Sequence, residues 1–374
     1  YLRRIADYWH ERFESHGKRI VTVNEFLNKK IVDYIRKDFD LRPSMKNRIR
    51  MSKADLLELT KEQYRRLDDM IDNERVIIKG GAGTGKTLLA VEEARRQSLN
   101  GKKVFLCCYN KNLGIELKKA TEDLPKITAG HLHGFMTDKI KEAELQSQLP
   151  DAHKDDLLRV FYPEVCVEAL MNTNQLQNYD VLIVDEGQDL LSESYFEVFE
   201  TLLKNGLEKG DWKFFYDPTQ NIYGGINPNT LKLLNNGHPA KFVLTENCRN
   251  TEKIAVATNL ISGIEIPKTK KTSGIEVGTD YFNDVSQLRN AVSNSVNRLL
   301  SGGIKPWEIT ILGPKRLENS NLKNGLLNVP YNLTEDISAS DPSSNTIRYS
   351  TIKAFKGLES DAVILVDIDD LESP

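Results

Sequence analysis

Residues 76–90, VIIKGGAGTGKTLLA, decide the fold of this 374-residue chain. The run within them fits the pattern G-x-x-x-x-G-K-T and has apolar residues on both sides. Glycines let backbone N–H groups curve around phosphate oxygens, and the helix expected to follow favours negative charge at its first turn. We therefore predict a phosphate-binding loop made of Gly80, Gly81, Ala82, Gly83, Thr84, Gly85, Lys86 and Thr87.

A second stretch, YDVLIVDEGQD at residues 179–189, completes the predicted site. Four apolar residues lead into Asp185 and Glu186, and open α/β sheets bind ligands at the carboxyl ends of such strands. Lys86 would reach the β- and γ-phosphates, whereas Thr87 and Asp185 would hold Mg²⁺, the aspartate through water. Glu186 would orient and deprotonate the attacking water. We expect hydrolysis of a nucleoside triphosphate.

The order of the other segments predicts an α/β fold with two tandem units. From residue 73, β-rich runs alternate with helix-like stretches, which is typical of parallel sheets covered by helices. A second set follows, with a helix over 284–301 and β-rich runs that include GIEVGTDYF (274–282). We expect a charged helical segment over 1–58, a first unit over 59–240 with a short helical insertion near 136–178, and a second unit over 241–374.

Composition limits the partners and the cellular compartment that we expect for this chain. The formal net charge of −3 gives no overall basic signature, so a nucleic acid would have to bind in a local groove. A run of about 18 apolar residues, as a membrane span needs, is missing from the sequence. The four cysteines lack metal-type spacing and favour buried, reduced thiols in the cytoplasm. Because the sequence begins at Tyr1 and stops just after a strand-like run, we expect a piece of a longer protein.

The stretch DEGQD resembles motif II of superfamily 1 helicases of the UvrD/Rep type, and further segments resemble other motifs of that family in its order. LTKEQ (59–63) is similar to the Q motif, FLCCYNKNL (105–113) to motif Ia and HLHGF (131–135) to motif Ib. YDPTQNIYG (216–224), LTENCRNT (244–251) and TIKAFKGLESDAVIL (351–365) are similar to motifs III, IV and V. The resemblance implies two RecA-like domains that use ATP and Mg²⁺.

The resemblance also implies roles for individual residues. Gln63 would read the adenine edge, Gln220 would sense the γ-phosphate, and Arg249 would reach across to it from the second unit. Gly357 and Glu359 would lie at the nucleotide, the glutamate on the ribose. The predicted contacts to nucleic acid are stacking by Tyr109, Phe135 and Tyr223, with core packing as the alternative for each, and polar contacts by Asn110, His133, Thr351 and Lys353.

Several features depart from the family pattern. Cys248 stands where the family usually has a tyrosine that stacks on adenine, and Lys353 stands in place of a histidine. Motif VI would fall after the end of the sequence, and the insertions are too short for large accessory subdomains. Residues 6–13, ADYWHERF, together with 59–87 resemble the junction in bacterial proteins that join a nuclease-related domain to a UvrD-like ATPase.

Two functions follow from these patterns. The first is an ATP-dependent translocase on single-stranded DNA, or on RNA, with an upstream nuclease domain or partner protein and no membrane. The second is an ATP-binding regulatory switch that does not translocate. A small-molecule kinase explains neither the second unit nor the motif V stretch.

Two substitutions separate binding from chemistry at the predicted site. Lys86→Ala should abolish nucleotide binding because the ammonium group contacts the phosphates. Glu186→Gln should keep binding and lose hydrolysis, since the carboxylate only positions and deprotonates water. Binding of a fluorescent ATP analogue and steady-state turnover measure the two effects. Turnover by Glu186→Gln at the wild-type rate would show that Glu186 is not the base.

Overall fold

The computed structural model of the chain describes residues 63, 67–68, 71, 73–151, 157–218, 228–263, 268–269, 274–335 and 346–368. The chain divides into two units at Pro43 and Ser44, and every described residue belongs to the second unit. The helical segment predicted for residues 1–58 lies outside the described residues. Within the described ranges, no helix combines the length and the apolar character that a membrane crossing requires.

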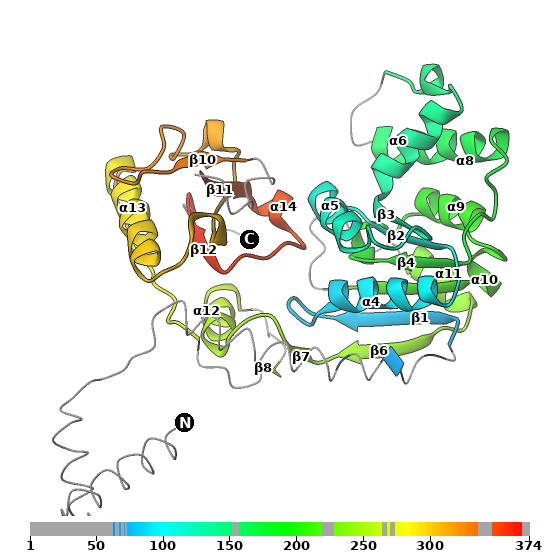
Figure 1. Cartoon of the computed structure of the whole chain (residues 1–374), viewed down its shortest axis with the longest axis horizontal. Coiled ribbons are helices and arrows are strands. Elements are labelled where there is room, and N and C mark those ends of the chain that lie inside the picture. The colour runs from blue at the N-terminus through cyan, green and yellow to red at the C-terminus, as the bar shows by residue number, and fades with distance from the viewer. Residues whose placement is uncertain are drawn as a thin grey trace, which may run out of the picture. The chain divides into compact units, whose positions relative to one another are not determined.

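A parallel sheet of six strands carries the first half of the described chain (Figure 1). Strands β2 and β4 are buried at every residue, as expected for strands with helices on both faces. The strands lie in the order β3 (Ile127–His131), β2 (Val104–Cys108), β4 (Val181–Val184), β5 (Asp211–Tyr216), β1 (Arg75–Gly80) and β6 (Ala240–Leu244).

Two apolar cores cover the two faces of this sheet. The first core joins the sheet to α6 (Leu132–Glu142), α8 (Tyr162–Asn172) and α9 (Glu193–Leu202). The second joins it to α4 (Lys86–Leu99) and α5 (Lys111–Ala120). Because all strands are parallel and both faces are covered, their carboxyl ends meet at one edge, which is where the phosphate loop begins.

The segment between β3 and β4, where we predict the short helical insertion near 136–178, contains helices and turns. It contains α6, a short 3-10 turn η1 (Gln146–Gln148), a π-helical turn η2 (Leu157–Phe161) and α8. The buried residues of α6 and α8 belong to the first core, so the insertion packs on the sheet. Two further helices, α10 (Gly206–Lys209) and α11 (Pro228–Asn236), flank β5 along the chain.

A second parallel sheet has four strands and its own core. The helix predicted over 284–301 is present as α13 (Val285–Ser301) and packs on this sheet through Leu288, Val292 and Val296. The strands follow the order β10 (Asn332–Thr334), β11 (Thr346–Thr351), β9 (Ile309–Gly313) and β12 (Ala362–Leu365). The shorter elements are β7 (Glu246–Asn247), β8 (Lys268–Thr269), α12 (Glu252–Ser262), η3 (Gly187–Asp189), η4 (Pro306–Glu308), η5 (Leu317–Asn319) and α14 (Ile352–Phe355).

The prediction of a β-rich run at 274–282 is wrong, because these residues form no strand. Most of them are exposed, and Val277 and Tyr281 place apolar side chains in solvent instead of on a neighbouring strand. The expected boundary at residue 240 falls at the start of β6, and β6 pairs with β1 over Val76–Gly80. The chain therefore leaves the first sheet only after Leu244.

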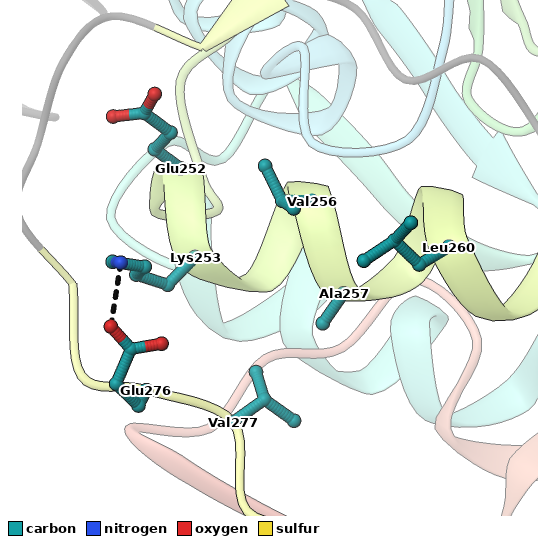
Figure 2. Close-up of a pocket in the computed structure, with 7 residues that line it drawn as sticks. All are labelled: Glu252, Lys253, Val256, Ala257, Leu260, Glu276 and Val277. Carbon is teal, nitrogen blue, oxygen red and sulfur yellow. Dashed lines mark ion pairs between the residues drawn. The ribbon is translucent and has the colours of Figure 1, made fainter.

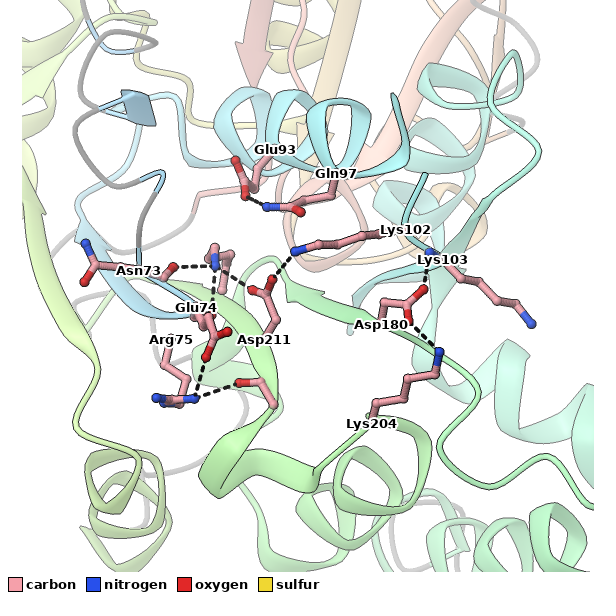
Figure 3. Close-up of polar contacts among 12 residues, drawn as sticks. Asn73, Glu74, Arg75, Glu93, Gln97, Lys102, Lys103, Asp180, Lys204 and Asp211 are labelled. Carbon is pink, nitrogen blue, oxygen red and sulfur yellow. Dashed lines mark hydrogen bonds and ion pairs between the residues drawn. The ribbon is translucent and has the colours of Figure 1, made fainter. Parts of the chain in front are cut away.

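A group of polar contacts lies at the opposite edge of the first sheet, where β1 and β5 begin (Figure 3). The ammonium group of the buried Lys213 donates to the carbonyl oxygens of Asn73 and Glu74, both at 2.8 Å. It also lies 2.7 Å from Asp211 Oδ1, and Lys102 Nζ lies 2.8 Å from Asp211 Oδ2. Each donor of Lys213 therefore has an acceptor, which a buried ammonium group requires.

This arrangement predicts a large loss of stability in Lys213→Met. The change removes a buried charge and leaves the Asn73 carbonyl and Asp211 Oδ1 without this donor, while the Glu74 carbonyl keeps the Trp212 N–H. The free energy of unfolding should fall by about 3 kcal/mol. Lys102→Met is the matched control, since the Lys102 side chain is 42% exposed and shares the same aspartate. Urea unfolding measures both; equal effects would contradict the role of burial.

Candidate active site

The phosphate loop follows β1 directly and ends in the first turn of α4. Gly83 has a φ of 77°, a conformation that side chains rarely adopt. The buried Lys86 donates to the carbonyl oxygens of Gly80 at 3.0 Å and Gly81 at 3.1 Å, and the hydroxyl of Thr84 donates to Gly81 at 2.8 Å. The loop is thus a closed turn with its lysine folded onto its own backbone.

Two carboxylates follow neighbouring strands at this edge. Asp185 comes directly after β4, and Asp217 comes directly after β5. Both side chains are completely buried, and Asp217 Oδ2 lies 3.9 Å from Lys86 Nζ. Parallel strands thus bring carboxylates that are distant in the sequence to the loop lysine.

Asp185 has the features of a residue that holds a magnesium ion. Burial, and next the charge of Glu186, raise its pKa to about 6, while the Thr87 hydroxyl, Lys86 and a backbone N–H oppose the shift. Oδ1 accepts the N–H of Glu186 at 2.9 Å, but among the described residues Oδ2 has no hydrogen-bond partner. A hard cation would satisfy this buried oxygen, and Mg²⁺ typically takes one or two protein oxygens together with phosphate. Thr87 and Asp185 therefore fit the ion.

Glu186 is held in an unusual conformation beside these groups. Its φ of 51° and ψ of 42° lie in the left-handed region, where strain is often associated with a functional site. Gln188 Nε2 donates to Glu186 Oε2, and Gln188 Oε1 accepts the N–H of Asp217 at 2.9 Å. The amide of Gln188 thus fixes the predicted base relative to the end of β5.

The segment after β6 returns to the phosphate loop. The N–H of Cys248 donates to the carbonyl oxygen of Gly83 at 2.8 Å, and Cys248 Sγ lies 3.3 Å from Gln63 Oε1. Gln63 and Cys248 are both buried, and Gln63 lies close to Gly85. The residue predicted to read the base and the residue in place of the family's tyrosine are therefore in contact.

Two more residues predicted to meet the nucleotide pair with each other. Arg249 Nε lies 3.1 Å from Glu359 Oε2, and the glutamate side chain is 72% exposed. Gly357 has a φ of 82°, and an added Cβ would lie 2.8 Å from Leu113 on α5. The stretch after β11 therefore packs on the first half of the chain through a glycine.

A buried ion pair joins the same two parts of the chain. Lys356 Nζ lies 2.6 Å from Asp189 Oδ2, and their side chains are only 4% and 2% exposed. Asp189 ends η3, the turn that begins after Glu186, whereas Lys356 follows α14. Burial raises the pKa of Asp189, and Lys356 opposes the shift. The turn that carries the predicted base is thus fixed to the stretch that resembles motif V.

Three of the residues predicted to bind nucleic acid meet where α5 and α14 begin. Asn110 Oδ1 accepts the N–H of Asn112 at 2.8 Å and caps α5, while Asn110 Nδ2 donates to the Lys353 carbonyl at 3.2 Å. The Thr351 hydroxyl accepts the N–H of Ala354 and caps α14. Lys353 itself is exposed.

The other aromatic and histidine positions lie in or against the first core. His133 Nε2 is 2.8 Å from the Tyr195 hydroxyl, and the Tyr109 ring meets the His133 ring edge-on at 5.0 Å. Phe135 packs against Phe105 with ring centroids 4.6 Å apart. Gln220 and Tyr223 lie outside the described residues.

Comparison with known proteins agrees with this geometry. Residues 63–226 match a family model described as an AAA domain. The match supports a P-loop, helicase-type family. It covers the phosphate loop and both strand-end carboxylates. Comparison with curated proteins found no match.

Several residues of this site had no role in the prediction from sequence. Gln188 and Asp189 lie inside the DEGQD stretch, which already marked the site. Asp217 directly follows a strand-like run, as Asp185 does, and this signal could have identified it. For Asn247 and Lys356, by contrast, only the structure reveals a role, because Asn247 lies against Gly83 and Lys356 pairs with Asp189, both far away in the sequence.

A pocket beside α12 has a different chemistry (Figure 2). Apolar side chains of Val256, Leu260 and Val277 line it, and Lys253 forms an ion pair with Glu276 at its rim. These residues offer no glycine-rich turn for phosphate. The pocket therefore lacks the features of the phosphate site.

His133 predicts a dependence of stability on pH. Burial, the largest cause, lowers its pKa to about 4. The unfolded chain, with an ordinary histidine pKa of about 6.5, binds more protons between these values, so stability should fall as pH drops from about 6.5 to about 4. His133→Gln should flatten this part of a plot of unfolding free energy against pH, whereas the exposed His238→Gln should not. An unchanged slope in His133→Gln would contradict the assignment.

Proposed function

We propose that the chain is the ATPase part of a UvrD-like translocase that moves along single-stranded nucleic acid, with its two sheets as RecA-like domains. The observation that carries the proposal is the buried pair of Lys356 and Asp189. It connects the turn after Glu186 to the stretch after β11, so a change at the nucleotide has a direct route to the second sheet. A kinase that only phosphorylates a small molecule does not need this connection.

The chemistry we propose uses residues that the fold already brings together. The backbone of the phosphate loop and Lys86 bind the phosphates of ATP, and Thr87 with Asp185 holds Mg²⁺. Glu186, positioned by Gln188, takes the proton of the attacking water. Arg249 leaves Glu359 and stabilises the charge that develops on the γ-phosphate.

Single-stranded DNA is the partner we propose, and RNA is the alternative. The exposed Lys353 and Lys111 lie at the starts of α14 and α5, where Asn110 joins the two segments. Lysines there would attract a phosphate backbone without reading its sequence. An upstream nuclease domain, as the resemblance of residues 6–13 and 59–87 implies, is the setting we propose.

One observation favours the regulatory switch as a second candidate. The Asn110 side chain both caps α5 and donates to the Lys353 carbonyl, so its polar atoms already serve contacts within the protein. Asn112 Nδ2 likewise donates to the Ala354 carbonyl at 2.9 Å. A protein that uses this surface only to join its own parts would hydrolyse ATP without a response to DNA.

Turnover measured with and without an oligonucleotide, at two salt concentrations, tests the proposal. Wild-type turnover should rise with single-stranded DNA, and the rise should shrink at high salt because the contacts are mainly to phosphate. Asp189→Asn and Lys356→Met should lose most of the stimulation while affinity for an ATP analogue changes less than about threefold, since neither residue contacts the phosphates. The exposed Lys323→Met is the control.

Three outcomes are informative. Stimulation by DNA that survives in both ion-pair variants would contradict the route through Lys356 and Asp189. Hydrolysis that ignores nucleic acid at low salt would favour the switch. No hydrolysis by the wild-type chain would contradict the translocase, and loss of nucleotide binding as well would contradict both functions.

A further inference from the structure

Asn247, the last residue of β7, organises the turn that carries Arg249. Its side chain is fully buried. Oδ1 accepts the N–H of Arg249 at 3.0 Å and the N–H of Asn250 at 2.9 Å. A side-chain oxygen that accepts two successive backbone N–H groups fixes the direction in which the chain leaves the strand. The backbone of Arg249 is thus set by the amide of Asn247.

The same amide lies against the phosphate loop. A Cβ built on Gly83 would be 2.4 Å from Asn247 Oδ1 and 2.9 Å from Nδ2, so the amide occupies the space that a side chain at Gly83 would need. The next residue, Cys248, donates its N–H to the Gly83 carbonyl at 2.8 Å. The glycine of the loop and the turn before Arg249 are therefore in direct contact.

The orientation of the amide follows from its partners. Because Oδ1 accepts two N–H groups, exchange of the oxygen and nitrogen would place donors against donors. Nδ2, which like Oδ1 lies against Gly83, then has no hydrogen-bond partner within the described residues. Buried amides without a partner are rare, and one next to a catalytic loop calls for an explanation.

We propose that Asn247 is a positioning residue for ATP hydrolysis, which holds Arg249 in register with the phosphate loop. The inference rests on the proposed function, because it gives Arg249 a role at the γ-phosphate. Asn247 acts through Arg249 and not on the nucleotide. The Asn247 amide fills the space that a side chain at Gly83 would need, in addition to the φ of 77° that favours glycine there.

Asn247→Ala and Asn247→Ser form a matched pair that differs by one oxygen. Serine accepts backbone N–H groups in turns nearly as well as asparagine, whereas alanine cannot. Asn247→Ala should lower kcat by about 10², comparable with Arg249→Ala, while affinity for a fluorescent ATP analogue changes less than about threefold. Asn247→Ser should recover most of the lost turnover. Asn247→Ala should add little in an Arg249→Ala background, since the two residues act together.

Amide hydrogen exchange of a peptide that spans residues 244–252 provides a readout without turnover. Arg249 and Asn250 should exchange faster in Asn247→Ala and near the wild-type rate in Asn247→Ser. If Asn247→Ala does not fold, Asn247→Gln replaces it, because the extra methylene displaces the acceptor while the amide is retained.

The outcomes separate this inference from the function on which it rests. Unchanged kcat in the alanine variant, serine as poor as alanine, or effects of Asn247→Ala and Arg249→Ala that multiply would each overturn the inference while the ATPase stands. A wild-type chain that hydrolyses no nucleoside triphosphate would overturn the proposed function and this inference with it.

Discussion

The buried ion pair between Asp189 and Lys356 links the two sheets by charge, beside the hydrogen bonds that Asn110 and Asn112 make to the stretch after β11. Both charged side chains are almost completely buried, so two charges have left water and only close geometry compensates for that loss. Removing one partner would leave the other charge buried and unpaired, which would strongly destabilise the folded chain. The pair therefore fixes the turn after β4 to the stretch after β11.

The other groups of the candidate site are connected to the turn after β4 by a short series of contacts. Gln188 connects Glu186 to the backbone of Asp217, and Asp217 lies beside Lys86 in the phosphate loop. On the other side of the loop, Cys248 and Asn247 contact Gly83 and lead to Arg249 and Glu359. A change at the phosphates can thus reach the second sheet by two routes, one through an ion pair and one through the backbone.

Sequence patterns predicted the parts of the fold that are locally encoded. The glycine-rich loop with its flanking strand and helix and the strand before Asp185 are confirmed. The short strand β3, Ile127–His131, carries two small residues and gave no strong β-rich signal. The contact between Asp189 and Lys356 joins residues 167 positions apart, and a sequence pattern holds no information on such a pair. His133 on α6 likewise meets its partner, Tyr195 on α9, only through the tertiary packing of the first core.

The distance between the two sheets, followed by spin labels, tests the central claim most directly. All four native cysteines are buried, so labels can be placed at Met171 on α8 and Val285 on α13, which are 57% and 47% exposed. A non-hydrolysable ATP analogue with Mg²⁺ should shift the distance distribution in the wild-type chain, and Asp189→Asn should weaken that shift without loss of nucleotide binding. A distribution that nucleotide leaves unchanged in the wild-type chain, with binding verified in the same sample, would contradict the account.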